Sequence, residues 1–350
     1  MLRPEPTRIE PVFSPRIWGT RSLAPLFPDK TNLPEPIGEA WLTGLDCRIA
    51  TGPFAGKTLG EAWREMPAEW RGTRLASIAQ FPLLVKFIFP NEKLSIQVHP
   101  DDAYAATHEQ ATGGRGKTEM WHAVSAEPGA KVLIGLKPGA TKERFLEFLA
   151  AQKPEDLFEG YQVNSGETFF VPAGTAHTIG PGMVLCEVQE YSDLTYRVYD
   201  YGRVDSRGNP RELHIQKALD VIRFGGPAGG KTSQIRLQEK GLERSLLAAC
   251  SYFATERWKN FGTVEIRSDS GHFDLYVILA GSGEFAWANG KSHFHPGQCW
   301  FLPANLGQLV LHANEPTKIL RTYVPDLEAL RNLLVQEGQS RMEIAKTVFD

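Results

Sequence analysis

GETFFVPAGTAHTI, residues 166–179, is matched in outline by GQCWFLPANLGQLV, residues 297–310. Each segment reads glycine, five residues, proline, alanine, and then a short turn followed by a run typical of a strand. A pattern that recurs in two distant parts of a chain indicates two copies of one structural unit. The sequence therefore predicts two related β-modules.

The two copies differ where chemistry would be expected. The first fits the pattern G-x5-P-x-G-x2-H, which ends at His177. The second has Asn305 in place of Gly174 and Gln308 in place of His177. Because the second copy keeps its turns and lacks the imidazole, we expect one functional module and one structural partner.

Short apolar runs separated by glycine, proline or asparagine make up most of the chain, which predicts a mainly β protein with a sandwich or barrel architecture. Thr141 can cap one helix, and Asn209-Pro210 predicts the start of another. Strands are expected within residues 81–100, 119–126, 131–136, 162–172, 183–190, 195–201, 251–262, 263–270, 272–281, 283–290, 291–297, 299–304 and 308–314. Helices are expected at 101–110, 141–151, 211–222 and 326–346, with a linker at 225–233.

Composition narrows the function. The formal net charge of the 350 residues is -3, whereas nucleic-acid binding usually requires a basic domain. The four cysteines are far apart and form no C-x-x-C, which argues against a disulfide framework or a thiolate zinc site. The N-terminal residues lack an apolar signal region, and the longest apolar stretch, 81–89, is too short to span a bilayer. We therefore expect a cytoplasmic protein with no nucleic-acid or membrane partner.

Four residues have the chemistry of a metal site. Gln97 and His99 are two positions apart on an expected strand, so their side chains point to the same side of the sheet. Glu119 opens another strand, and His177 follows the Pro-x-Gly turn. Two imidazoles, a carboxylate and an amide oxygen can surround one divalent cation such as zinc. The alternative is that each histidine is a satisfied core or surface residue, and the motif around His177 weighs against it.

Other candidates are weaker. His293 and His295 form H-x-H but are more simply read as exposed strand residues. The loop GGRGKT lacks the first glycine of a phosphate-binding loop, because Ala111 occupies that place, and it follows an expected helix rather than a strand. Lys117 in this loop is two residues before Glu119 and would share its face on an extended strand. Lys86 is either the partner of a carboxylate or an edge residue that reaches water.

Two arginines lie in the aromatic run EYSDLTYRVYDYGR. Arg197 and Arg203 can pair with Asp200, stack on a tyrosine, or meet an anionic substrate, because guanidinium matches phosphate and enolate oxygens. The sequence leaves these interpretations open.

Four segments together resemble a known family. LSIQVHPDD (94–102), GKTEMWHAV (116–124), VPAGTAHTI (171–179) and TYRVYDYGR (195–203) are similar, in order, to signature segments of type I mannose-6-phosphate isomerase. The remainder fits the short form of that family. The resemblance implies two cupin-like jelly-roll β-barrels with a few helices. The expected division is a catalytic cupin domain at residues 1–225 and a degenerate cupin domain with a terminal helix at 226–350.

The resemblance also implies an activity and a set of roles. It implies one Zn²⁺ per chain, held by Gln97, His99, Glu119 and His177, and interconversion of mannose 6-phosphate and fructose 6-phosphate through an ene-diol(ate). Arg197 matches the catalytic arginine. The resemblance places Ser95 and Lys117 at the substrate site, Lys117 with a catalytic role, and Arg203 where a basic residue suits the phosphate. The catalytic base is open among Lys117, Glu119, a metal-bound water and His99.

Three other functions are alternatives to mannose-6-phosphate isomerase. An Fe(II) cupin oxygenase uses two histidines and a carboxylate, but a glutamine ligand and the two arginines favour the isomerase. An isomerase of another 6-phosphosugar and a non-catalytic sugar-phosphate-binding cupin are the remaining alternatives. In each isomerase or binding case the partner is a small sugar phosphate, and the sequence does not specify an oligomeric state.

Overall fold

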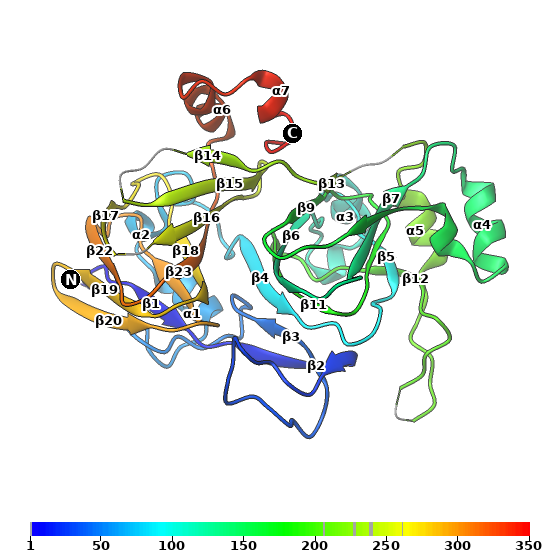
Figure 1. Ribbon diagram of the computed structural model, residues 1–350, viewed down its shortest axis with the longest axis horizontal. Helices are drawn as coiled ribbons and strands as arrows, with labels where there is room; N and C mark the ends of the chain where they lie inside the picture. The colour runs from blue at the N-terminus through cyan, green and yellow to red at the C-terminus, as the bar shows by residue number, and fades with distance from the viewer. Residues whose placement is uncertain (1, 206, 227–228, 238–240, 261) are drawn as a thin grey trace.

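Two β-barrels lie side by side in the computed structural model, which describes residues 2–205, 207–226, 229–237, 241–260 and 262–350 (Figure 1). Each barrel is made of two antiparallel sheets. The mainly β fold with a few helices is confirmed. The barrel at the right of Figure 1 carries the predicted site residues, and we call it the first barrel.

The first barrel contains a large and a small sheet. The order of the large sheet is β13 (Gly230–Lys231), β9 (Thr168–Val171), β6 (Glu119–Ala126), β11 (Met183–Glu190), β4 (Leu83–Ile88), β3 (Ile37–Trp41) and β2 (Val12–Thr20). The order of the small sheet is β12 (Tyr196–Tyr199), β5 (Ile96–Val98), β10 (His177–Ile179), β7 (Lys131–Leu136) and β8 (Phe158–Gln162).

The second barrel repeats this plan. The order of its large sheet is β1 (Thr7–Ile9), β21 (Cys299–Leu302), β18 (Asp274–Ala280), β23 (Thr317–Tyr323), β16 (Ala254–Asn260), β15 (Glu243–Ala249) and β14 (Ile235–Leu237). The order of its small sheet is β17 (Thr263–Arg267), β22 (Gln308–Ala313), β19 (Gly283–Trp287) and β20 (Gly290–Phe294). Among the described residues, the small sheet of the first barrel has one more edge strand, β12, than that of the second.

The sequence repeat is confirmed by the strands that it forms. β9 and β21 occupy the same place in the two large sheets, and β10 and β22 begin at the matched positions His177 and Gln308. Gly166 and Gly297, which precede β9 and β21, have φ of 86° and 82°, a region that suits glycine. The repeated glycine is therefore required by the turn that enters this strand.

The two barrels exchange one strand each. β1, near the N-terminus, pairs with β21 of the second barrel, whereas β13 pairs with β9 of the first barrel. The predicted linker 225–233 is thus partly wrong, because Gly230–Lys231 is a strand; residues 227–228 lie outside the described part of the chain. The division at residue 225 stays a prediction, and β1 and β13 both cross it.

Seven α-helices in the described residues cover the barrels. They are α1 (Leu59–Glu65), α2 (Ala68–Arg71), α3 (Asp102–His108), α4 (Lys142–Ala150), α5 (Ile215–Val221), α6 (Leu327–Gln336) and α7 (Arg341–Ile344), with 3₁₀ turns η1 (Gln110–Thr112) and η2 (Pro154–Leu157). The side chain of Thr141 accepts a hydrogen bond from the amide of Arg144, so the predicted cap of α4 is confirmed.

Two helix predictions need correction. The helix expected at 211–222 starts only at Ile215, because Arg211 pairs with Asp200 and the amide of His214 donates to the carbonyl of Arg197. These tertiary contacts hold the preceding segment extended against β12. The single helix expected at 326–346 is two helices, α6 and α7, separated by a turn in which Gly338 has φ of 88°.

Aromatic packing joins the two barrels. Trp63 on α1 is buried, with its ring centroid 5.2 Å from that of Phe81 and 5.6 Å from that of Phe273 on the second-barrel side. Phe349 at the C-terminal end stacks on Phe170 of β9 at 4.0 Å. Several strands outside the expected set, including β15, β23 and the three N-terminal strands, contribute to this packing. Among the described residues, no helix is long and apolar enough to cross a membrane.

Trp63→Ala tests the packing between the barrels. Replacing a fully buried tryptophan by alanine is expected to lower the free energy of unfolding by about 3–5 kcal/mol, because apolar contact is lost and a cavity remains. Urea unfolding followed by circular dichroism measures this. The control is Leu333→Ala at an exposed position of α6, which should change stability by less than about 0.5 kcal/mol. Equal effects of the two substitutions would contradict the packing described.

Candidate metal centre

The four predicted ligands come together inside the first barrel. Gln97 lies in β5 and His99 directly after it, Glu119 begins β6, and His177 begins β10. Gln97 and His177 are direct partners in the β5–β10 pairing. The two sheets of the barrel therefore face each other with these side chains between them, as the alternation of residues along strands requires.

The donor atoms are close enough to share one ion. One ligand atom from each of His99, Glu119 and His177 lies within 4.8 Å of the other two, and all three residues are buried. Nε2 of His177 is 3.3 Å from Oε1 of Glu119, and Nε2 of His99 is 3.7 Å from Oε2. Nε2 of Gln97 is 3.2 Å from Nε2 of His177.

Backbone carbonyls fix the orientation of both imidazoles. Nδ1 of His99 is 2.8 Å from the carbonyl oxygen of Leu194, and Nδ1 of His177 is 2.8 Å from that of Thr175. Each Nδ1–H thus donates outward and each Nε2 faces the centre, the arrangement that metal-bound histidines adopt. Burial lowers the pKa of His177 to about 4 and that of His99 well below its usual value, so both rings are neutral at pH 7.

Several buried polar atoms at this centre lack hydrogen-bond partners. Nε2 of His99 and the carboxylate oxygens of Glu119 make no hydrogen bond within the described structure, although Oε2 forms an ion pair with Lys117 at 2.9 Å. Buried polar groups without partners are costly, and a divalent cation at this point satisfies them. Turning the amide of Gln97 presents its oxygen, since the two ends of an amide are assigned from their contacts. The residues therefore fit a zinc-type ion.

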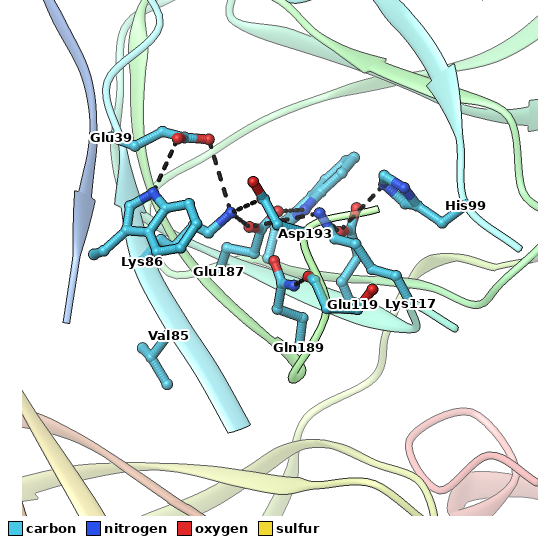
Figure 2. Close-up of polar contacts among 12 residues, drawn as sticks. Glu39, Val85, Lys86, His99, Lys117, Glu119, Glu187, Gln189 and Asp193 are labelled. Carbon is cyan, nitrogen blue, oxygen red and sulfur yellow. Dashed lines mark hydrogen bonds and ion pairs between the residues drawn. The ribbon is translucent and has the colours of Figure 1, made fainter. Parts of the chain in front are cut away.

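A row of alternating charges leads away from the centre (Figure 2). Lys117 lies 2.9 Å from Glu119 and 4.0 Å from Glu187. Lys86 lies 3.9 Å from Glu187 and 2.9 Å from Asp193. Lys86 is fully buried and also stacks on a tryptophan, so of its two interpretations the carboxylate partner is confirmed.

The row continues from Lys86 to Glu39 at 3.9 Å, and Glu39 binds Arg16 at 2.6 Å near the surface. The row therefore connects the buried centre with the mouth of the barrel.

Two groups in this row have displaced pKa values. Burial raises the pKa of Glu187 to about 7, against the opposing effect of Lys117. Burial alone would lower the pKa of Lys117, but the carboxylates of Glu119 and Glu187 outweigh it and hold that pKa above its ordinary value. Lys117 is thus a fixed cation at neutral pH, whereas Glu187 exchanges a proton there.

A cavity of about 410 Å³ opens beside the centre. Its lining combines buried polar groups with three arginines. The lining residues are Arg16, Trp18, Glu39, Lys86, Ile88, Leu94, Ser95, Gln97, Lys117, Ile179, Glu187, Asp193, Thr195, Arg197, Arg211 and His214. Ser95, Lys117 and Arg197 from the predicted set therefore face this cavity, and Arg203 is not among its lining residues.

The two predicted arginines have different surroundings. Arg197 lies on β12 opposite Gln97, donates from Nη1 to the carbonyl of Glu212, and has a buried Nε without a hydrogen-bond partner. Arg203 binds Asp200 and the carbonyl of Lys93 outside the cavity wall. Arg211 binds the same Asp200 but does line the cavity. Asp200 therefore orients one arginine toward the cavity and one away from it.

Sequence reasoning missed Glu187, Asp193 and Arg211. A signal for Glu187 is present, because a charged residue in the apolar strand MVLCEVQE indicates a partner inside the fold. Asp193 and Arg211 lie in irregular segments whose placement depends on tertiary contacts. His293 is an exposed residue of β20, 3.7 Å from Glu284, and it is not part of the buried cluster.

The fold and the centre together define a two-barrel cupin enzyme, in which one barrel keeps a His₂Glu cluster beside a cationic cavity. Comparison with known proteins narrows this class. A sequence model described as "Phosphomannose isomerase type I, catalytic domain" matches residues 7–125. The mannose-6-phosphate isomerase of Streptococcus mutans is 34% identical over 325 residues, covering 89% of this chain and 99% of that protein. The chain belongs to the type I mannose-6-phosphate isomerase family.

Further comparisons agree with this assignment. ManA, the mannose-6-phosphate isomerase of Bacillus subtilis, is 32% identical over 315 residues, covering 88% of this chain and 96% of that protein. A crystal structure of a B. subtilis mannose 6-phosphate isomerase matches with a TM-score of 0.82 at 29% identity, covering 91% of this chain and 99% of the other. A structure from Archaeoglobus fulgidus, with a TM-score of 0.72 at 20% identity and covering 92% and 98%, shows the same fold.

His177→Ala tests the ligand set directly. Loss of one imidazole is expected to weaken metal retention at least as much as the 10–100-fold that loss of a supporting contact costs. Elemental analysis after dialysis against a zinc buffer measures the bound metal. His293→Ala is the control, because this exposed histidine should not affect retention. Full metal retention by His177→Ala would contradict the site.

Proposed function

We propose that this chain interconverts mannose 6-phosphate and fructose 6-phosphate, using one zinc ion per chain held by Gln97, His99, Glu119 and His177. The observation that carries the proposal is the buried His₂Glu cluster with unsatisfied donor atoms, next to a cavity lined by arginines. Family membership supports the same reaction and substrate.

The reaction moves a proton between C1 and C2 of the sugar through an ene-diol(ate). Negative charge develops on oxygen in the transition state, and this charge is the main barrier. A zinc ion at the centre supplies Lewis-acid polarisation of the sugar oxygens. The protein residues around the cavity must then supply a base, stabilise the oxyanion and hold the phosphate.

Glu187 is the base that the geometry favours. Its carboxyl group faces the cavity, and a pKa of about 7 suits a group that takes and returns a proton at neutral pH. Lys117 stays protonated between Glu119 and Glu187, so its catalytic role is to stabilise developing negative charge rather than to accept the proton. Glu119 and His99 are both engaged at the centre.

Arg197 and its neighbours suit the anionic parts of the substrate. Its guanidinium lines the cavity from β12, and it can stabilise the enediolate oxygen from the side opposite the centre. Arg16 and Arg211 line the outer cavity and suit a phosphate group. Arg203, for which the same role was predicted, lies behind Asp200, so we propose that it positions this carboxylate and Arg211 holds the phosphate. Ser95 is a neutral hydrogen-bonding group in the same wall.

The cavity also bears on the alternatives. The His₂Glu set alone suits a non-haem iron oxygenase. A buried carboxyl group whose pKa is raised to about 7, beside two buried lysines at the cavity wall, suits proton transfer and so supports the isomerase over a protein that only binds the sugar phosphate. A cytoplasmic location is part of the proposal, because all four cysteines are free and buried.

Glu187→Gln tests the base. The substitution preserves size and removes proton exchange, so kcat should fall by about 10²–10⁴-fold with little change in KM. A coupled assay with mannose 6-phosphate measures this. In the wild type, kcat/KM should rise with pH through about 7, since Glu187 must lose its proton to act as a base; this rise should vanish in the variant.

The matched control is Glu190→Gln. Glu190 is a buried glutamate on the same strand, and burial raises its pKa to about 8, but it binds the amide of Thr118 outside the cavity lining. Its substitution should leave the pH profile near 7 unchanged. An equal loss of activity in the two variants, or an unchanged kcat in Glu187→Gln, would contradict the assignment.

Arg211→Gln and Arg203→Gln test where the phosphate lies. Losing a charge-assisted hydrogen bond costs about 1.5–3 kcal/mol of binding free energy, so Arg211→Gln should raise the KM for mannose 6-phosphate by about 10–100-fold. Arg203→Gln removes the other partner of Asp200 and should have a much smaller effect on KM. Steady-state kinetics of both variants measures the difference. A larger KM effect at Arg203 would restore the sequence-based role of that residue.

A further inference from the structure

The second barrel contains a counterpart of the catalytic cavity. In the first barrel Glu119 pairs with Val171, and in the second Asp274 pairs with Leu302, the residue that matches Val171 in the repeat. Asp274 therefore stands at the position of Glu119. The same strand pairings extend this equivalence across both large sheets.

Three further charged positions of the first barrel, those of Glu187, Lys86 and Glu39, can be matched in this way. Glu187 pairs with Trp121 two residues beyond Glu119, and Arg321 pairs with Tyr276 two residues beyond Asp274. Arg321 therefore stands at the position of Glu187.

Lys86, which pairs with Glu187, corresponds to Glu256, which pairs with Arg321. Glu39 pairs with Ile88, two residues after Lys86, and Arg244 pairs with Trp258, two residues after Glu256.

The second barrel thus reverses the sign of each of these charges. The row Glu39–Lys86–Glu187 is replaced by Arg244–Glu256–Arg321 at the same backbone positions. The replacement row is closely paired, with Nε of Arg244 2.9 Å from Glu256 and Nη1 of Arg321 3.4 Å from Glu256. Nε of Arg321 is 3.0 Å from Asp274. A guanidinium group therefore takes the place of a carboxylate in the wall of this barrel.

A cavity of about 260 Å³ lies over this row. Arg244, Arg321, Trp258, Glu265 and Arg267 are in its lining. By the same strand pairings, Trp258 stands at the position of Ile88 and Glu265 at the position of Ser95, both of which line the catalytic cavity. The cavity is therefore the repeat-related partner of the catalytic one, with three arginines and one carboxylate in its wall.

A metal ion does not suit this cavity. Gln308 pairs with Arg267 as His177 pairs with Gln97, so a glutamine stands at one ligand position and an arginine at another. The arginine would repel a cation. The donor set that made the first barrel a metal site is therefore replaced by groups that favour negative charge.

Arg267 and Arg321 retain donor groups that no hydrogen bond to a described residue uses. Arg267 forms no ion pair with any residue that the structure describes, and the hydrogen bonds of Arg321 to those residues leave from Nε and Nη1 but not from Nη2. Arg244 and Arg321 both stack on Trp258, at 5.6 and 5.5 Å from its ring centroid, which holds their planes in fixed orientations. Fixed guanidinium groups bind phosphate oxygens in a two-point geometry.

Carboxylates nearby offset part of this positive charge, and Arg267 is the cation of the wall without an ion-pair partner among the described residues. Glu256 and Asp274 are buried and are engaged by Arg244 and Arg321. Glu265 is in the wall, where its carboxylate accepts a hydrogen bond from Gln308. A ligand is therefore expected to bind with its anionic group toward Arg267 and Arg321, away from Glu265.

We propose that the cavity of the second barrel binds a small anion with a phosphate group, at a site separate from the catalytic cavity. Arg267 and Arg321 contact the phosphate oxygens, and Trp258 forms the floor on which the guanidinium groups are held. This site does not depend on the isomerase reaction, so its test is independent of activity.

The test follows Trp258 by fluorine NMR in the zinc-loaded full-length protein labelled with 5-fluorotryptophan. Trp258→Phe identifies its resonance by the signal that disappears. Inorganic phosphate is the probe, and chloride at equal ionic strength is the comparison. We expect the Trp258 resonance to shift with saturation at millimolar phosphate, a range typical of weak anion sites, and not to shift with chloride.

Two variants locate the binding. Arg267→Gln, at an exposed position, should weaken the phosphate response of Trp258 about tenfold or more, as expected for a lost charge-assisted contact. Arg211→Gln, in the catalytic cavity, should leave it unchanged. The proposal is overturned if Trp258 does not respond to phosphate, if its shift grows without saturation, if chloride shifts it equally, or if Arg267→Gln responds like the wild type.

Discussion

The buried negative charge of Glu119 determines how the first barrel is built. Its carboxylate lies between two imidazoles that burial keeps neutral, and Lys117 is its one close cation among the described residues. An ionised carboxyl group in such a place is stable only with strong compensation. The outward Nδ1–H bonds of both histidines and the unsatisfied Nε2 of His99 fit a cation at this centre, which would supply that compensation.

The second barrel compensates its buried carboxylates with an arginine. At matched backbone positions it places Arg321 between Glu256 and Asp274, so that the protein supplies its own cation. The two barrels therefore share a framework of strands and keep a carboxylate at Glu119 and Asp274, but they carry opposite charges at the other three matched positions. The imidazole of the repeat accompanies the first arrangement, and Gln308 stands at its place in the second.

The sequence predicted most of the features that depend on local pattern. The repeat, the strands that bear it and the cap at Thr141 are all local, and so are the segments that carry the four predicted ligands, which lie in β5 or at strand ends. The strand exchange of β1 and β13 could not be predicted, because backbone pairing there joins residues about 290 positions apart for β1 and about 60 positions apart for β13. The roles of Glu187 and Asp193 depend on distances to Lys86 that no spacing reveals. Arg203 was assigned to the phosphate from the family resemblance alone, and Arg211 lies in a segment that was expected to be helical and is extended against Asp200.

The most direct test of the account is the isomerase activity of protein stripped of metal by a chelator and then given zinc. The account predicts that the stripped protein stays folded and does not convert mannose 6-phosphate, and that about one equivalent of zinc per chain restores conversion. A folded, metal-free protein that still isomerises the sugar phosphate, or a zinc-loaded protein that does not, would contradict it.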